Sequence, residues 1–115
     1  MTKSYRDITG AVSDSLKQLR VNEPDLMKSF NALAEAALRE GELTKKTKEL
    51  IALAIGVVEG CDGCIASHAE AAARAGATRE EAAEAIGVTF LMKGGPATIY
   101  GPRAYDAFCE FSEAQ

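Results

Sequence analysis

Apolar residues recur at the three- and four-residue spacing of an α-helix along almost the whole chain. The first apolar face ends before Pro24 and consists of Val12, Leu16 and Leu19. A second helix is expected from Pro24 to Glu40, with Gly41 as its C-cap. Its apolar stripe consists of Leu26, Phe30, Leu33, Ala34, Ala37 and Leu38. No alternating strand pattern, repeat or low-complexity stretch is present, so the first third predicts two helices.

Two further helices are expected on either side of Gly60. Thr44 can cap a helix that runs to about Glu59, and Gly60 ends it. Past Leu50 this helix is apolar on nearly every face, so we expect it at the centre of the core. The next helix is expected from about Asp62 to Ala75, with Gly76 as its stop.

The last third predicts two more helices. Thr78 and Glu81 form a capping box for a helix that runs to Lys93. Gly94-Gly95-Pro96 breaks the chain, and a last helix is expected from Ala97 to about Ser112, kinked or restarted at Gly101-Pro102. The pattern therefore predicts an all-α bundle of about six helices, with residues 1–115 as a single domain.

Composition and charge exclude several classes of protein. Ala is abundant and Trp is absent, so the core buries little area per residue and we expect a homo-oligomer. The net charge is −4 and no basic block exists, so no nucleic-acid partner is expected. The first twenty residues do not resemble a secretory signal, and the longest apolar run, Ile51 to Val58, is too short to span a bilayer. We therefore expect a cytoplasmic protein with no membrane partner.

The segment around Cys61 and Cys64 carries the candidate chemistry. In a reducing compartment a Cys-x-x-Cys pair is typical of a catalytic or metal-binding site rather than of a structural disulfide. The two cysteines are three residues apart at a predicted helix start, so they share a face and a modest adjustment can close a disulfide. The positive end of the helix dipole favours the reactive thiolate.

Two more residues are candidates for proton transfer. His68, the only histidine, follows Cys64 by four residues, which places the imidazole beside that sulfur on a helix. The helices that flank Gly60 are expected to fold back on each other, which brings Glu49 opposite His68. Glu49 shares its helical stripe with Leu53 and Gly56, so it can face inward and orient the imidazole.

Other interpretations of the same residues remain open. Cys61, Cys64 and His68 could bind zinc, with Glu49 or Glu59 as the fourth ligand, although structural zinc sites usually have more cysteines. His68 could be a structural histidine, and Glu49 could be a solvated partner of Lys45. Glu59 is most simply a helix-end charge, and Cys109 a buried small side chain. We expect no cofactor and no bound metal.

The spacing Glu49, Cys61-Asp-Gly-Cys64, His68 resembles the signature of the alkylhydroperoxidase-D-like branch of the carboxymuconolactone decarboxylase superfamily. The flanks agree: Leu43 to Leu50 is similar to the family's entry into its central helix, and Met92 to Ala97 with Tyr100 to its glycine-proline segment. The resemblance covers roughly Pro24 to Phe111. It implies an all-α fold that assembles as trimers or hexamers.

The resemblance also implies an activity and its residues. Cys64 would attack a hydroperoxide, Cys61 would be the proton donor and resolving thiol, and Glu49 with His68 would form the proton relay. The implied partners are a hydroperoxide substrate and a thiol or dithiol reductant protein, and the implied role is antioxidant. Gly63 stands where alkylhydroperoxidase D carries a histidine, so the relay has one group fewer. We expect an apolar peroxide pocket near Cys64, lined by the segment from Gly94 to Tyr100.

Two other functions compete with a thiol-dependent peroxidase or disulfide oxidoreductase. A lactone decarboxylase like the superfamily's namesake acts without a cysteine pair, so the motif counts against it. A non-enzymatic redox sensor would use the same dithiol to change its oligomeric state.

Overall fold

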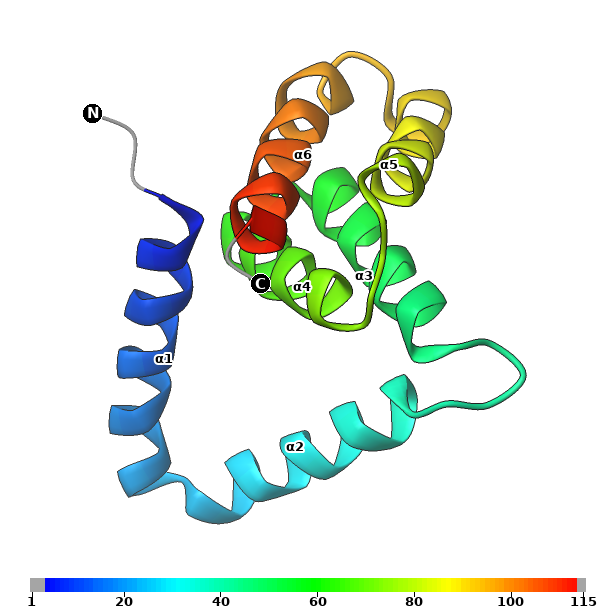
Figure 1. Ribbon diagram of the computed structural model, residues 1–115. Helices are drawn as coiled ribbons and strands as arrows, with labels where there is room; N and C mark the ends of the chain where they lie inside the picture. Colours follow the sequence, from blue (N-terminus) through cyan, green and yellow to red (C-terminus); the bar gives the residue numbers. More distant parts are fainter. Residues whose placement is uncertain (1–3, 114–115) are drawn as a thin grey trace.

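The computed structural model describes residues 4–113, which form six α-helices and, within that range, no strand. The helices are α1 (Tyr5–Asn22), α2 (Pro24–Leu38), α3 (Lys45–Glu59), α4 (Asp62–Arg74), α5 (Arg79–Lys93) and α6 (Ala97–Glu113). Figure 1 shows their arrangement. The predicted all-α class and the six helices are confirmed. In the described part of the chain, no helix is both long and apolar enough to cross a bilayer.

The helix ends follow local sequence signals. The Thr44 hydroxyl accepts a hydrogen bond from the Thr47 N–H at 3.1 Å at the start of α3. The Thr78 hydroxyl accepts from the Glu81 N–H, and the Glu81 carboxylate accepts in return from the Thr78 N–H, so the predicted capping box is confirmed. Lys46 also donates to Glu81, which joins α3 to α5 and lowers the pKa of that carboxyl.

One predicted helix end is wrong, and one predicted interruption is absent. The second helix ends at Leu38, two residues before Glu40, and its C-cap is Arg39 in an extended conformation rather than Gly41. The Lys48 ammonium donates to the Arg39 carbonyl at 2.7 Å, which gives the helix end a partner from α3. Of the kink or restart expected at Gly101-Pro102, the restart is absent, because Pro102 lies inside one continuous helix. Pro102 is in the second helical turn, so its missing N–H removes only one backbone hydrogen bond.

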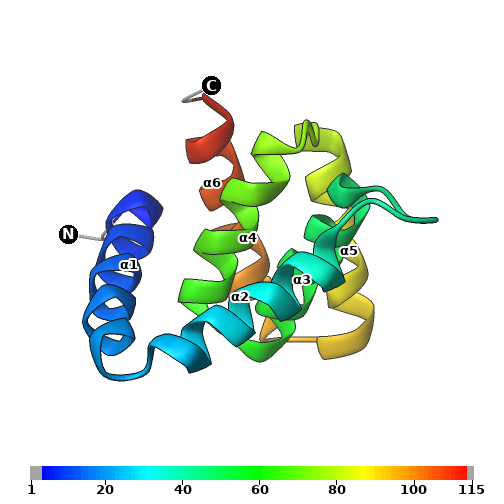
Figure 2. The same ribbon diagram turned by 90° about the horizontal axis from the view of Figure 1, so that it is seen from below.

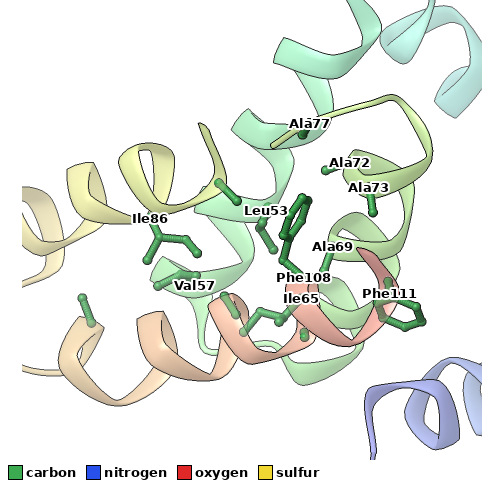
Figure 3. Packing of buried hydrophobic residues seen from close by; sticks show 14 residues of the cluster. Leu53, Val57, Ile65, Ala69, Ala72, Ala73, Ala77, Ile86, Phe108 and Phe111 are labelled. Atoms are coloured by element: carbon green, nitrogen blue, oxygen red, sulfur yellow. The ribbon is translucent and has the colours of Figure 1, made fainter. Parts of the chain in front are cut away.

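The core lies among α3, α4, α5 and α6, which pack on one another as a four-helix body. Figure 3 shows Phe108 of α6 pointing into the centre of this cluster, beside Leu53 of α3 and Ala69 of α4. Nine of the sixteen buried hydrophobic residues in the described range are alanine. The expectation of an Ala-rich core is confirmed.

α1 and α2 lie outside this body as an L-shaped arm, seen from two directions in Figures 1 and 2. No residue of α1 is buried, and α2 buries only Met27. Most of the apolar stripe predicted for α2 is therefore exposed, with Leu33 at 62%, and only Ala34 and Leu38 of the stripe are partly buried. Ile51 and Ile55 of α3 are also exposed, at 46% and 56%, so the prediction that α3 is buried on nearly every face is wrong for one side of the helix.

The arm is attached to the body through Glu110 of α6. Its carboxylate accepts hydrogen bonds from the Tyr5 and Arg6 N–H groups at 3.2 and 3.0 Å, and its carbonyl accepts from the Arg6 guanidinium. These bonds supply partners for two of the N–H groups that the start of α1 leaves free. α1 is thereby held alongside α4, the helix that carries the cysteine motif.

Candidate active site

The site is built on the turn between α3 and α4. Gly60 ends α3 in the left-handed conformation (φ 65°), which favours glycine because it has no Cβ. Cys61 then adopts an extended conformation as the N-cap of α4. Its Sγ accepts a hydrogen bond from the Cys64 N–H at 3.1 Å. The sequence predicted both cysteines at the helix start, and the structure places Cys61 just outside the helix and Cys64 in its first turn.

Cys61 and Cys64 form a disulfide, with their Cα atoms 5.2 Å apart. Cys64 is exposed and Cys61 is half-buried. Both sulfurs lie at the N-terminus of α4, where the helix dipole stabilises negative charge. A reduced pair in this position favours the thiolate, which is the reactive form of cysteine. Cys109, the remaining cysteine, is a free and partly buried residue of α6.

His68 and Glu49 form a hydrogen-bonded pair across α3 and α4. The Nδ1 atom of His68 lies 2.7 Å from Oε1 of Glu49. Glu49 is only 2% exposed, whereas the His68 side chain is 29% exposed. When Nδ1 carries the proton that it donates to the carboxylate, Nε2 keeps a lone pair and can accept a proton. His68 lies one helical turn after Cys64, so the imidazole is a neighbour of that residue on α4.

The two helices approach closely under Cys64 because Gly56 has no side chain. A Cβ at Gly56 would lie 3.3 Å from both the Cys64 Cβ and the Ile65 backbone nitrogen. This contact lets α3 and α4 pack against each other where the cysteine and histidine lie. It also explains why Glu49, two turns earlier on the same stripe of α3, faces His68 rather than solvent.

Two clefts flank the exposed side of α4. One, of about 370 Å³, reaches Glu49 and is lined also by Lys45, Ser67, Glu70, Ala71, Arg74 and Ala75. The other, of about 240 Å³, lies between α1 and α4 and is lined by Thr9, Val12, Ser13, Leu16, Arg20, Gly63, Ser67 and Glu70. Neither includes the segment from Gly94 to Tyr100 that we expected to line a peroxide pocket. Of that segment, Tyr100 reaches the motif, where its ring contacts Gly60.

Gly63 is covered by the arm. A Cβ at this position would lie 3.6 Å from Cγ2 of Val12 in α1, an ordinary van der Waals distance. A larger side chain at this position would therefore extend against α1.

The structure bears on three alternative interpretations of these residues, namely a zinc site, a solvated Glu49 and a helix-end charge at Glu59. Within residues 4–113 no group of three or more His, Cys, Asp or Glu side chains is arranged to hold a metal ion. Glu49 is bonded to His68 rather than solvated beside Lys45, which lines the adjoining cleft. Glu59 is exposed at the end of α3.

Sequence reasoning missed the contacts that α1 and α6 make with the motif. Arg103 of α6 lies 3.8 Å from Asp62, the residue after Cys61. Ser67 lines both clefts, and its position three residues after Cys64 was the only sequence signal for it. Contacts between helices that are far apart in the sequence produce no periodic pattern, so the sequence alone does not predict them.

The family model for the carboxymuconolactone decarboxylase family matches residues 24–107 of the chain. This range runs from the start of α2 into α6. The chain belongs to this family. The resemblance found in the sequence is thereby confirmed, and the carboxymuconolactone decarboxylase family includes enzymes.

Similar solved structures and a curated relative cover most of the chain. The family protein lpg0406 of Legionella pneumophila is 44% identical, with a TM-score of 0.91 over 94% of this chain and 96% of that one. A Thermotoga maritima family member, for which an involvement in the antioxidative response is suggested, is 29% identical, with a TM-score of 0.77 over 93% and 91%. An uncharacterised protein of Cupriavidus necator is 40% identical over 86 residues, 75% of this chain and 76% of its own length.

Proposed function

We propose that this family member is a cytoplasmic thiol-dependent peroxidase or disulfide oxidoreductase with an antioxidant role. The observation that carries the proposal is the Cys61–Cys64 disulfide at the start of α4, one turn from a His68 that is bonded to the buried Glu49. A nucleophilic thiol, a neighbouring base and a third group that orients the base are the parts that cysteine catalysis requires. The antioxidative response suggested for the Thermotoga maritima relative supports the same reaction class.

In the proposed first half-reaction, His68 takes the proton of the Cys64 thiol. The thiolate attacks one oxygen of a hydroperoxide, so that an S–O bond forms and the O–O bond breaks. The leaving oxygen takes a proton from His68 and departs as an alcohol. Cys64 is oxidised by two electrons to a sulfenic acid, and Glu49 stabilises the transient imidazolium.

In the second half-reaction, the Cys61 sulfur attacks the sulfenic acid. An S–S bond forms, the S–O bond breaks, and the proton of Cys61 leaves with the hydroxide as water. A thiol or dithiol reductant protein then supplies two electrons and two protons to restore both thiols. A Cys61–Cys64 disulfide is the product that this proposed cycle forms before the reductant acts, and the two residues are close enough to pair.

The experiment for this proposal is peroxide oxidation of the fully reduced chain, followed by thiol titration and intact mass. The chain has three cysteines, and we expect hydrogen peroxide or cumene hydroperoxide to remove two thiols and the mass of two hydrogen atoms. Cys109→Ser is the matched control and should give the same loss. Oxidation no faster than that of free cysteine would exclude peroxidase chemistry.

The competing functions give different results in the same preparation. Dithiothreitol reduces an accessible disulfide in either case, so a redox sensor is identified instead by a change of oligomeric state between the reduced and the oxidised chain. A lactone decarboxylase would retain its activity after both motif cysteines are replaced. The peroxidase requires repeated peroxide consumption that depends on the cysteines.

We further propose that a second copy of this chain covers the exposed face of α2. Leu26, Phe30 and Leu33 lie on this face and are more than half exposed, and Ile51 and Ile55 of α3 add to the apolar surface. Monomers rarely expose contiguous apolar patches of more than a few hundred Å². A helix of fifteen residues is marginal in water without tertiary packing. The exposed face of α2 therefore needs another apolar surface to pack on. A second copy of the chain in a homo-oligomer, a trimer or hexamer, provides this surface.

Light scattering coupled to gel filtration tests this assembly. Wild type should have a multiple of the chain mass, and Leu33→Glu should dissociate it because a charge is placed in the buried contact. Val88→Glu, an equally exposed apolar position on α5, is the control for an added charge. A monomeric wild type, or a Leu33→Glu variant that assembles fully, would contradict the proposal.

A further inference from the structure

Tyr100 of α6 packs against the turn that carries Cys61. A Cβ at Gly60 would lie 3.3 Å from the Cε2 and Cζ atoms of the Tyr100 ring, so the ring lies against the glycine backbone. The start of α4 is therefore in contact with α6 as well as with α3. Side chains of α6 are thus available to act on the cysteine turn.

Arg103 lies one helical turn after Tyr100 and continues this contact. Its guanidinium carbon is 5.2 Å from the centroid of the Tyr100 ring, which is a cation–π distance. Its Nη1 atom is 3.8 Å from Oδ1 of Asp62. The guanidinium is therefore held between an aromatic ring that touches Gly60 and a carboxylate that directly follows Cys61.

The charges around the turn are mostly negative. Asp62 is in the first turn of α4, Glu59 is in the last turn of α3, and Asp106 is on α6. The same charges act on the hydroxyl of Tyr5 in α1. Burial raises the pKa of Tyr5, the Asp62 carboxylate raises it further, and the Arg103 guanidinium lowers it. Each of these carboxylates disfavours a thiolate at the turn.

Two other charged or titratable groups on the helices that pack around α4 have partners of their own. Glu110 of α6 accepts from the first N–H groups of α1 and lies 4.0 Å from the Arg6 guanidinium. His68 is bonded to Glu49. Of the basic side chains that these contacts place around the turn, Arg103 is the one paired with the residue next to Cys61.

We propose that Arg103 is a positioning residue that offsets the negative charge of Asp62 and thereby maintains the reactive thiolate of the Cys61–Cys64 pair near neutral pH. The effect acts through the electric field at the turn and needs no contact with the substrate. This inference rests on the proposed thiol chemistry, because it concerns the ionisation of the same two thiols.

Replacing Arg103 should raise the pH at which the reactive thiol is half ionised. For Arg103→Met, which keeps an unbranched side chain without the charge, we expect a rise of about half a unit, the size typical of exposed ion pairs. The thiolate fraction and the rate with peroxide should fall about threefold near pH 7. Asp62 and Arg103 are both half-exposed, so the shift should shrink as salt is added.

The test is ultraviolet titration of the thiolate in the reduced full-length chain with Cys109→Ser, so that only the two motif thiols contribute. Arg103→Met should raise the midpoint, Arg103→Lys should keep it near the parent value, and Asp62→Asn should lower it. The double variant Asp62→Asn with Arg103→Met should return close to the parent, because both charges are removed. Circular dichroism of each variant checks the helices.

An unchanged midpoint in a folded Arg103→Met variant would overturn the proposal. A Lys variant that shifts as far as the Met variant would also overturn it, because geometry rather than charge would then be responsible. If Arg103→Met does not fold, the Asp62→Asn variant decides: a lower midpoint of thiol titration supports the proposal, and an unchanged or higher midpoint overturns it. The titration uses no peroxide, so it separates failure of this inference from failure of the peroxidase proposal.

Discussion

Replacing Cys64 with serine is expected to lower hydroperoxide turnover to the rate without protein. A serine hydroxyl cannot form the sulfenic acid, and it is far less ionised than a thiol near pH 7. Cys64 is the exposed member of the pair and the one that lies a helical turn from His68. Steady-state consumption of cumene hydroperoxide with dithiothreitol as reductant measures the loss.

Cys61→Ser is the informative partner of this variant. It should react once with peroxide and stop at a sulfenic acid on Cys64, which a dimedone adduct and its mass identify. Cys109→Ser should turn over like wild type, since Cys109 is on α6 and outside the motif. A Cys64→Ser variant that forms the sulfenic acid on Cys61 would reverse the proposed roles of the two cysteines.

Replacing His68 with glutamine is expected to slow Cys64 oxidation by about 10² or more, the contribution typical of a positioned acid or base. Glutamine can still donate a hydrogen bond to Glu49, so the buried carboxylate keeps a partner. Alanine would leave that carboxylate unpaired and destabilise the fold by a separate mechanism. Stopped-flow oxidation of the reduced chain, with stability followed by urea unfolding, measures the two effects separately.

Glu49→Gln tests the other half of the pair. The glutamine amide has the shape of the Glu49 carboxylate but no charge. His68 therefore keeps its position but loses the group that stabilises the imidazolium. We expect a smaller drop in rate than for His68→Gln. Glu113→Gln, at the exposed ion pair with Arg79, is the matched control and should be neutral. An unaltered oxidation rate in His68→Gln would show that the imidazole takes no part in activating the thiol.

The local signals in the sequence were sufficient for most helix boundaries. Thr44 and Thr78 cap α3 and α5 as expected, because an N-cap depends on residues within one helical turn. The pairing of Glu49 with His68 could also be predicted, since the turn at Gly60 is so short that α3 and α4 must fold back on each other. The role of each side chain in that pair stays a prediction.

The errors arose where distant parts of the chain decide the outcome. Ile51 and Ile55 were expected inside because periodicity cannot tell a core face from a face left for a partner. The end of α2 involves the Lys48 side chain, nine residues after Arg39. Glu110 and Arg103 act on α1 and α4 across long stretches of sequence, and no pattern within one helix announces such contacts.

The position of Cys61 as an N-cap has a consequence for the history of such a scaffold. Its sulfur accepts the Cys64 N–H, and a serine hydroxyl is among the preferred groups for the same task. A single nucleotide change from a cysteine to a serine codon would therefore end the dithiol cycle while the helix start keeps its cap. Descendants of this fold can lose redox chemistry without first losing their architecture, which leaves the clefts beside α4 available for selection toward other reactions.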